Sequence, residues 1–354
     1  MLSLGIIPGF VQASDDTLPR KTITIKALYG FSKSQWLVRG KTDSEIIMWI
    51  KKLGFNAVFF SHKDSTFIER LQKEGIKVYV EYSVFVGEKL WQKYPTSRPV
   101  TAKGKKLKKY KWYAAVNPTV EEIRQQKLDG IRSLVKETVV DGIWLDFIRW
   151  PCHWEVPTPK ILQTSFDQLT IKKFAADTGL SALLKYDNKR LMADKILTEH
   201  LDQWTCWKCQ QITSFVAEAR KIVDSAKRRI LLGAFTVPWT YSDYDGAIRT
   251  IIGHDYEALG KYLDVISPML YHSMCNRSVD WIGTVTTKIA GKVGCDICPI
   301  IRLADEPVKI PSLELEKALK TAITAQGSTG IILFSMQDLD SAKIKVIKDT
   351  FSHF

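Results

Sequence analysis

The chain has 354 residues, of which 45% are hydrophobic, so it is long enough to bury a sizeable core. It contains no apolar run close to the roughly 20 residues that a membrane-spanning helix needs, which excludes a membrane span. Its formal net charge of +13 favours an acidic partner, such as an anionic glycan, a membrane surface or nucleic acid.

The chain begins with a short apolar segment that ends in Val11-Gln12-Ala13, the small-x-Ala form of a signal-peptidase site. We therefore expect residues 1–20 to be the remnant of a signal peptide and the protein to be exported, to the periplasm or beyond. The alternative for this segment is an unstructured tail. Residues 21–354 are expected to form a single domain.

Strand and helix signals alternate along the rest of the chain. Apolar runs rich in β-branched and aromatic residues predict strands at 21–31, 56–62, 77–85, 139–151, 229–239, 264–272, 296–305 and 330–339. Apolar residues at helical spacing predict helices at 42–53, 64–74, 119–138, 195–227, 244–262, 278–290, 312–325 and 340–351. Two long connections, 86–118 and 151–195, follow the third and fourth strands.

Eight strand–helix units in strict alternation indicate parallel strands joined by right-handed crossovers. The predicted fold is therefore an α/β fold of the (β/α)8 TIM-barrel type, with long loops after strands three and four. An open doubly wound sheet is the alternative, but no Gly-rich phosphate loop follows the first strand. In such a barrel the functional residues lie on the face where the strands end.

Acidic residues occur at or just after several predicted strand ends. Asp146 is the most informative, because it interrupts an apolar strand, where an unpartnered charge is costly to bury. Glu81 lies near the end of strand three, Glu155 follows strand four and Asp243 follows strand five. Glycoside hydrolysis usually needs two carboxyl groups, and adjacent strand ends can place two acids at a suitable separation.

The segment DGIWLDFIRWP around Asp146, preceded by WYAAVNPTVEEIRQQ, resembles the bacterial glycosyl-hydrolase-like (β/α)8 barrel families. The segments ISPMLYH and GIILFSMQDL are similar in kind, and the resemblance runs from about residue 22 to 352. It implies that Asp146 is the catalytic carboxylate at the end of strand four. The second acid varies among such families, and Glu81 is favoured over Glu155 and Asp243 because a neighbouring strand places it firmly.

We therefore expect a glycosidase in which Asp146 is the nucleophile or base and Glu81 is the proton donor. The alternatives are a glycan-binding barrel without activity, and a polysaccharide lyase or metal-dependent enzyme on the same fold. No cofactor or metal is expected; the six histidines include no H-x-x-x-H pair. The two C-x-x-C pairs, at Cys206 and Cys295, lie far apart in the chain, which argues against a four-cysteine zinc site.

Residues near the predicted strand ends are candidates for binding a polysaccharide. They are Arg149, Trp150, His153, Trp154, Trp112, Tyr113, Asn117, Trp239, Tyr271, His272, Asp305 and Gln337. The stretch 103–111 holds six lysines, and its place after strand three predicts either a solvated loop or a cationic lip on the active face. Nucleic acid is a weaker interpretation of this patch, because no nucleic-acid-binding motif accompanies it.

Overall fold

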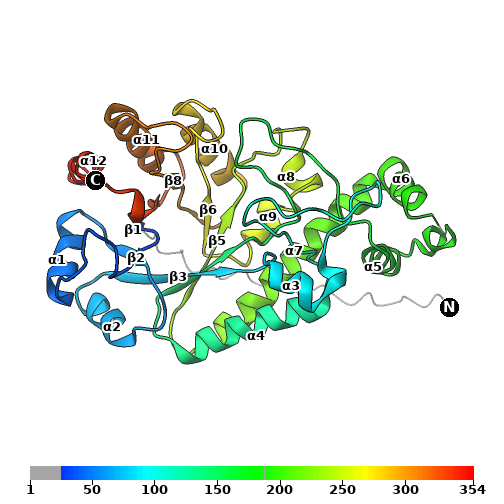
Figure 1. The fold of residues 1–354 in the computed structure, drawn as a ribbon, viewed down its shortest axis with the longest axis horizontal. Coiled ribbons are helices and arrows are strands. Elements are labelled where there is room, and N and C mark those ends of the chain that lie inside the picture. The colour runs from blue at the N-terminus through cyan, green and yellow to red at the C-terminus, as the bar shows by residue number, and fades with distance from the viewer. Residues whose placement is uncertain (1–24, 187) are drawn as a thin grey trace, which may run out of the picture.

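The computed structural model describes residues 25–186 and 188–354, so the expected signal-peptide remnant lies outside the described residues (Figure 1). The strands are β1 Ile25–Leu28, β2 Ala57–Phe59, β3 Lys77–Ser83, β4 Gly142–Asp146, β5 Leu231–Thr236, β6 Val265–Pro268, β7 Asp296–Ile297, β8 Ile300–Arg302 and β9 Gly330–Phe334. The α-helices are α1 Asp43–Lys52, α2 Ser65–Lys73, α3 Glu88–Lys93, α4 Glu121–Glu137, α5 Gln168–Thr178, α6 Lys189–Glu199, α7 Leu201–Asp224, α8 Ala247–Thr250, α9 Tyr256–Leu259, α10 Asp280–Ala290, α11 Ser312–Thr324 and α12 Ser341–Phe351. Three short 3-10 helices are η1 Pro95–Ser97, η2 Ser181–Lys185 and η3 Met336–Asp338.

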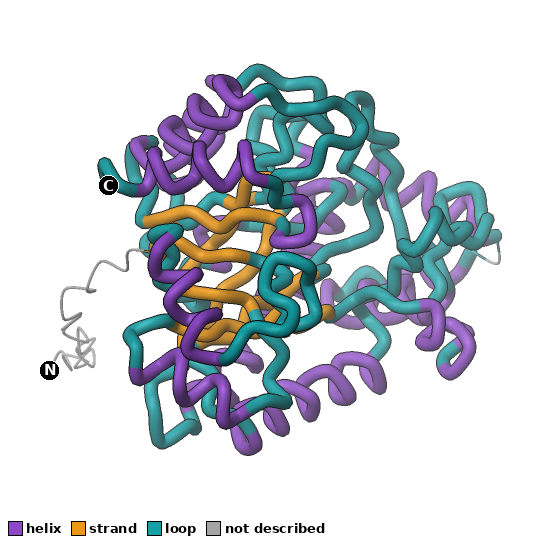
Figure 2. The backbone as a smooth tube through the Cα atoms, turned by 60° about the vertical axis from the view of Figure 1, so that its left-hand side comes forward, coloured by secondary structure: helices purple, strands orange, loops and turns teal. Residues whose placement is uncertain are grey.

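All nine strands are parallel and pair in the order β7-β6-β5-β4-β3-β2-β1-β9-β8. The two ends of this order, β7 and β8, are consecutive pieces of one predicted strand, separated by Cys298 and Pro299. Because proline lacks the N–H that a ladder needs, Pro299 accounts for the break. The sheet therefore closes on itself, and the predicted (β/α)8 barrel is confirmed, with its strands at the centre and helices around them (Figure 2).

One predicted helix, 244–262, is instead two single-turn helices, α8 and α9. Gly253 lies between them with φ of +77°, a left-handed conformation that ends a helix. Asp255 then caps α9, because its carboxylate accepts the backbone N–H of Ala258 at 3.1 Å. Helical periodicity alone could not show this interruption, although a glycine followed by an aspartate is its local signal.

Inside the barrel, aromatic rings fill a layer directly below the strand ends. Trp144 packs against Tyr79 and Phe59, with ring centroids 4.5 and 5.4 Å apart. Its indole N–H donates to Ser267 Oγ at 3.1 Å, which satisfies the buried polar group. Gly233 makes room for this indole, because a Cβ atom there would lie 2.2 Å from the ring. The next inward-facing position after Trp144 on β4 is Asp146.

At the opposite end of the barrel, Asp141 joins two strands. Its carboxylate accepts the backbone N–H of Val78 and the amide of Gln72, and pairs with Lys77. Asp264 makes the same kind of contact, because its carboxylate accepts the backbone N–H of Leu232 at 2.8 Å. Such acids stabilise strand starts, which is a structural role for Asp141.

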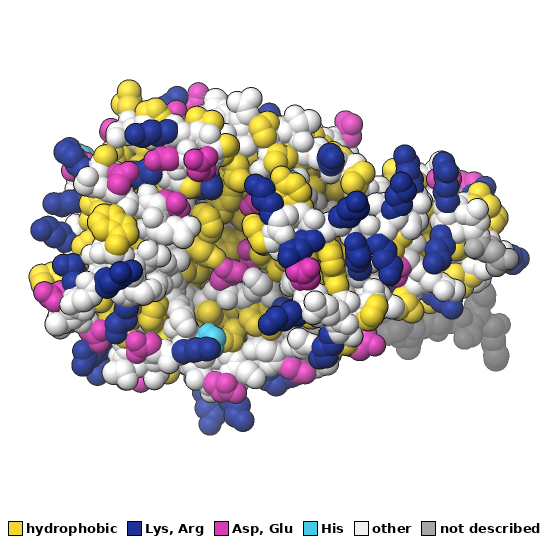
Figure 3. Space-filling model, viewed as in Figure 1, with side chains coloured by type: hydrophobic (Ala, Val, Ile, Leu, Met, Phe, Trp, Pro, Cys, Tyr) yellow, Lys and Arg dark blue, Asp and Glu magenta, His cyan; other side chains and the backbone are white. Residues whose placement is uncertain are grey.

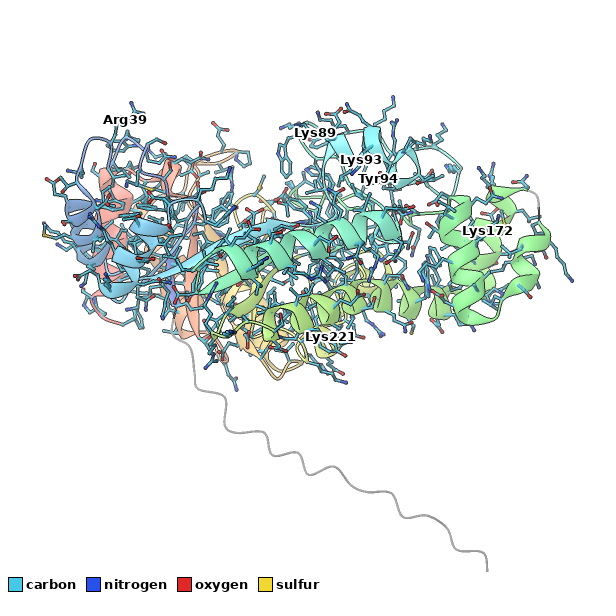
Figure 4. The ribbon with its side chains drawn as sticks, turned by 90° about the horizontal axis from the view of Figure 1, so that it is seen from below. Arg39, Lys89, Lys93, Tyr94, Lys172 and Lys221 are labelled. Carbon is cyan, nitrogen blue, oxygen red and sulfur yellow. The ribbon has the colours of Figure 1, made fainter. Side chains whose placement is uncertain are left out.

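Two long helices, α4 and α7, run side by side along the barrel, and α5 and α6 form a small extension beyond its strand ends (Figure 4). The connection 86–118 after β3 folds over the same end of the barrel as this extension. In the part of the chain that the structure describes, no helix is long and apolar enough to cross a membrane.

Candidate active site

The ends of β3 and β4 place two acids in one cavity. Ser83 is the register partner of Asp146, and Glu81 is the partner of Trp144. Because side chains alternate along a strand, Glu81 and Ser83 share the inward face of β3 with Tyr79. Glu81 and Ser83 line an inner cavity of about 280 Å³. Its lining residues are Tyr29, Glu81, Ser83, Trp112, Asp146, Phe147, Arg149, Glu155, Met269, Tyr271 and Phe334.

Asp146 lines this cavity and is held there by two neighbours. Its Oδ1 accepts the backbone N–H of Phe147 at 2.6 Å and lies 3.9 Å from the Arg149 guanidinium. Burial raises the pKa of Asp146 to about 7, and the negative charge of Glu81 adds to this rise. Arg149 and the Phe147 N–H act in the opposite direction but do not outweigh burial. The carboxyl group can therefore hold a proton near neutral pH, as a general acid must.

Both carboxylate oxygens of Glu81 accept hydrogen bonds from hydroxyl groups. Tyr29 donates to Oε2, and Ser83 Oγ donates to Oε1 at 2.7 Å. Burial raises the pKa of Tyr29 well above its ordinary value, and the neighbouring Glu81 raises it further, so Tyr29 remains a donor. These two bonds fix the orientation of the Glu81 carboxylate beside Asp146.

A third acid, Glu155, enters the cavity from the loop after β4. Burial raises its pKa, whereas Arg149 and Arg302 lower it. Glu155 also lines a middle cleft of about 460 Å³ next to the inner cavity. Glu155 therefore lies at the boundary between the two spaces, within the electrostatic influence of Arg149 and Arg302.

The backbone after Asp146 is strained. Phe147 has φ of +55°, in a left-handed region that a bulky side chain rarely adopts. Its ring contacts Trp112 and Tyr113, with centroids 5.8 and 5.9 Å away, and the Arg149 guanidinium lies 4.7 Å above it. Strain of this kind persists where surrounding contacts over-determine the conformation, and it clusters at functional sites.

The space above the acids continues outward along two loops. The middle cleft is lined by Tyr110, Lys111, Trp112, Tyr113, His153, Glu155, Val156, Pro157, Met274, Arg302, Glu306 and Pro307. An outer cleft of about 450 Å³ follows, lined by Leu107, Lys108, Tyr110, Tyr113, Ala115, Pro151, Cys152, His153, Val156, Thr158, Lys160, Leu162 and Thr164. Figure 3 shows a hollow near the centre of one face, with acidic side chains in it and Lys and Arg side chains to its right.

Several of the predicted binding residues do line these spaces. Arg149, Trp112 and Tyr271 belong to the inner cavity, and Tyr113 and His153 belong to the middle and outer clefts. Of the four predicted catalytic acids, the structure brings Glu81, Asp146 and Glu155 together.

Three predicted binding residues lie in the core instead. Trp150 is fully buried, donates its indole N–H to the Lys208 carbonyl at 3.0 Å and packs among tryptophans of α7. Trp154 is 1% exposed and stacks behind Tyr271, with ring centroids 5.7 Å apart. Trp239 is buried against Tyr244. Each ring is covered by protein and offers no free face to a sugar.

Two polar candidates are occupied by structural hydrogen bonds. Asp243 accepts both the backbone N–H and the hydroxyl of Thr240 at 2.6 Å, which caps a turn after β5. Asn117 is fully buried, and its amide donates to Asp167 and Thr170. These side chains line none of the three spaces described above.

The remaining candidates lie outside the same three spaces. His272 is buried, with its Nε2 atom 2.9 Å from the Glu314 carboxylate. Asp305 pairs with Lys343 at 3.2 Å, and Gln337 is exposed on η3. Asp305 and Gln337 nonetheless follow β8 and β9, whose last residues include the cavity-lining Phe334.

Sequence reasoning missed Tyr29, Ser83 and Arg302. Ser83 is the last residue of β3 and faces inward, and Tyr29 comes directly after β1, so alternation along each strand was the available signal. Arg302 ends β8, at the same face of the barrel. Cys152, Cys206, Cys209, Cys275 and Cys298 are free thiols. Among residues 25–186 and 188–354, no three His, Cys, Asp or Glu side chains gather into a group that could hold a metal ion.

The chain shares its fold with solved glycoside hydrolases. The PgaB (BpsB) glycoside hydrolase domain from Bordetella bronchiseptica is 11% identical, with a TM-score of 0.66 over 93% of this chain and 99% of that one. β-Galactosidases from Marinomonas ef1 and from G. stearothermophilus (Gan42B, solved as a catalytic mutant) are 12% and 15% identical, with TM-scores of 0.64 and 0.63. These two matches cover 92% and 94% of this chain but only 58% and 57% of the galactosidases, so the chain spans little more than half their length.

Comparison with curated proteins found no match. A family model described as "Putative glycosyl hydrolase domain" matches residues 46–288, which include β2 through β6, both acids of the β3–β4 pair and Glu155. The match covers more than half of the chain, and the barrel is the fold of the solved glycoside hydrolases. The chain therefore belongs to this glycosyl hydrolase family and is a glycosidase by class.

Proposed function

We propose that the protein hydrolyses glycosidic bonds in a polysaccharide, with Asp146 as the proton donor and Glu81 as the second carboxylate. The observation that carries this proposal is the cavity that both acids line, in which burial and the charge of Glu81 raise the pKa of Asp146 to about 7. The sequence favoured the opposite roles. The raised pKa of Asp146 and the two hydroxyl groups that donate to Glu81 support this reversal of roles.

In this scheme the Asp146 carboxyl group gives its proton to the bridging oxygen as the bond from that oxygen to the anomeric carbon breaks. Glu81 either bonds to the anomeric carbon or removes a proton from the attacking water. Water supplies the new hydroxyl group. If Glu81 has bonded to the anomeric carbon, Asp146 takes the proton of the water that breaks this bond, and if Glu81 has acted as base, the proton that it took returns to Asp146 through solvent. Removal of the negative charge on either acid would disturb the other, because each lies in the other's field.

Glu155 is the competing second acid, because it shares the inner cavity with Asp146. Glu81 is favoured because it raises the pKa of Asp146 more strongly than Glu155 does, and because two hydroxyl groups orient it. The variants Glu81→Gln and Glu155→Gln separate the two. We expect turnover to be lost in the first, whereas the second keeps measurable turnover.

A glycan-binding barrel without activity is the second candidate function. A binding module would be favoured if Asp146 had no acidic neighbour. Instead, two glutamates line the same cavity as Asp146. That arrangement supports the enzyme over the binding module.

The test is a screen of purified protein against neutral, acidic and amino-sugar polysaccharides, with the products identified by mass. Hydrolysis predicts that each new pair of ends has gained one water molecule. Unsaturated products lighter by one water would indicate a lyase, and binding without products would favour the second candidate.

We further propose that residues 21–354 form one catalytic domain and that the protein is exported. The support for the first is that the described strands join one closed sheet. The support for the second is the Val11-Gln12-Ala13 site. Expression of the full chain, followed by N-terminal sequencing of the protein outside the cytoplasm, tests export. Protein that remains in the cytoplasm with an uncleaved N-terminus would contradict it.

A further inference from the structure

We propose that the substrate is an acidic polysaccharide, and that Lys108 and Lys160 bind its anionic groups several sugars away from the bond that is cleaved. This inference rests on the proposed function, because it takes the inner cavity as the place of cleavage. It adds a binding region, the outer cleft, and the class of chemical group that this region recognises.

The three spaces adjoin one another, and we call them together the groove. The inner cavity and the middle cleft share Trp112 and Glu155 as lining residues. The middle and outer clefts share Tyr110, Tyr113 and His153. A polymer that reaches Asp146 can therefore extend outward without leaving the protein surface.

Charge is distributed unequally along this groove. The inner cavity contains Glu81, Asp146 and Glu155, with Arg149 as its one basic side chain among the described residues. The outer cleft contains Lys108 and Lys160, and no carboxylate of the described chain lines it. The middle cleft between them contains Lys111 and Arg302 together with Glu155 and Glu306. An anionic chain would thus be attracted mainly at the outer cleft, away from the acids of the inner cavity.

The two lysines come from different loops. Lys108 belongs to the connection after β3, and Lys160 to the connection after β4. Both are exposed, and within residues 25–186 and 188–354 neither amine has a hydrogen-bond or ion-pair partner. Their neighbour Lys109 differs, because it pairs with Glu88. Two amines without partners that line one cleft can each donate hydrogen bonds to anionic groups of a bound chain.

The connection after β3 extends this positive field. Residues 86–118 hold nine Lys or Arg side chains and a single acid, Glu88, so they supply eight of the thirteen net positive charges. The segment packs over the cleavage end of the barrel, and its helix α3 adds Lys89 and Lys93 beside the groove-forming loop (Figure 4). The charge of the protein is therefore concentrated next to the groove.

Aromatic rings beside these lysines favour a sugar polymer over other polyanions. Tyr110 is 48% exposed and packs against His153 at a tilt, with ring centroids 4.2 Å apart, and Trp112 is 62% exposed. Sugar rings pack against such faces. A nucleic acid could use the same surface, so a DNA duplex belongs in the experiment as a competing probe.

The experiment measures binding separately from cleavage, with full-length protein carrying Asp146→Asn so that substrate is not consumed. The probes are dextran, dextran sulfate, polygalacturonate, chitosan and a DNA duplex. Dextran and dextran sulfate share a backbone, so they isolate the effect of charge, and polygalacturonate tests carboxylate against sulfate. We expect polygalacturonate or dextran sulfate to bind, and dextran and chitosan to bind far more weakly.

The cleft variant Lys108→Gln/Lys160→Gln is compared with Lys172→Gln/Lys221→Gln, which removes the same charge from exposed sites on α5 and α7 (Figure 4). Loss of two charge-assisted contacts predicts that the cleft pair weakens acidic-glycan binding roughly tenfold or more. The control pair is expected to change it by less than about threefold, through the general field alone. Equal effects of the two pairs would overturn the inference.

The remaining outcomes separate the inference from the proposed function. Cleavage of only neutral or amino-sugar polysaccharides by the unmodified protein would refute the acidic substrate and leave the glycosidase standing. Lysine-dependent binding of acidic glycans without cleavage of any of them would support the cleft and refute the proposed hydrolysis. Tighter lysine-dependent binding of the DNA duplex than of any polysaccharide would overturn the inference in favour of nucleic acid.

Discussion

Glu81 and Asp146 lie on adjacent parallel strands, with Glu81 one inward-facing position below Asp146, because the register partner of Asp146 is Ser83. This diagonal relationship keeps both carboxyl groups in one cavity and in each other's field. Its consequence is a proton that stays on Asp146 to about pH 7, which the account requires of the group that protonates the leaving oxygen.

The first prediction concerns the pH dependence of turnover. Because Asp146 must be protonated and its pKa is about 7, kcat/KM should fall tenfold per pH unit above that value. A profile of kcat/KM from about pH 4 to 9 on the identified polysaccharide measures this. A descending limb that begins only above about pH 9 would mean that a different group donates the proton.

The second prediction separates the two charges that act on Asp146. Glu81→Gln removes the negative charge and should lower the pKa of Asp146, whereas Arg149→Gln removes the positive charge and should raise it. Carboxyl carbon NMR titration of the two variants, assigned with Asp146→Asn, gives the pKa without the need for activity. Shifts of the same sign in both variants would be inconsistent with the electrostatics of the cavity.

The third prediction links the same proton to stability. The native state holds a proton on Asp146 between about pH 4 and 7 that the unfolded chain has released, so the free energy of unfolding falls as pH rises through this window. Asp146→Asn removes that dependence and keeps an oxygen to accept the Phe147 N–H. At about pH 8 the variant should therefore be more stable than the unmodified protein.

Urea unfolding of the two proteins at about pH 4 and pH 8 measures this difference. The variant should be more stable than the unmodified protein at the higher pH. This difference should be much smaller at the lower pH, where Asp146 is protonated in the native state. An equal difference at the two pH values would show that the native pKa of Asp146 is not raised.

The fold was largely predictable because its signals are local. Apolar alternation, turn glycines and helix caps marked the alternating elements, and strict alternation predicted the closed barrel. Glu81 and Asp146 were predictable for the same reason, because a strand end fixes which face of the barrel a side chain meets. Pro299 also carried a readable signal for the split of the seventh strand.

The residues after the strand ends were not predictable in this way. Beyond Asp146 the backbone turns left-handed at Phe147, so alternation stops, and neighbours such as Trp150 and His153 point to different environments. Which tryptophan lies in the core depends on α7, which is distant in sequence. Asp243 follows a strand end, but its spacing from Thr240 is typical of a turn in which the carboxylate accepts a backbone N–H, and this is the role that it has.

The fourth prediction tests the aromatic layer beneath the acids. Gly233→Ala places a methyl group 2.2 Å from the Trp144 ring, which should destabilise the protein by about 1–3 kcal/mol or more through overpacking. Gly294→Ala is the matched control, because no atom lies within 4 Å of the added Cβ there. Denaturant unfolding of both variants measures the effect, and equal stability in the two would contradict the packing described for β4 and β5.

The most direct test of the account is the turnover of Asp146→Asn on two substrates of the same sugar, the polysaccharide and an aryl glycoside whose phenol leaves without a proton. A lost proton donor predicts a fall of roughly 10²–10⁴-fold on the polysaccharide and a much smaller fall on the aryl glycoside. Asp243→Asn, which changes an acid outside the cavity, should leave both activities close to those of the unmodified protein. Undiminished polysaccharide cleavage by Asp146→Asn, or equal loss on both substrates, would contradict the role assigned to Asp146.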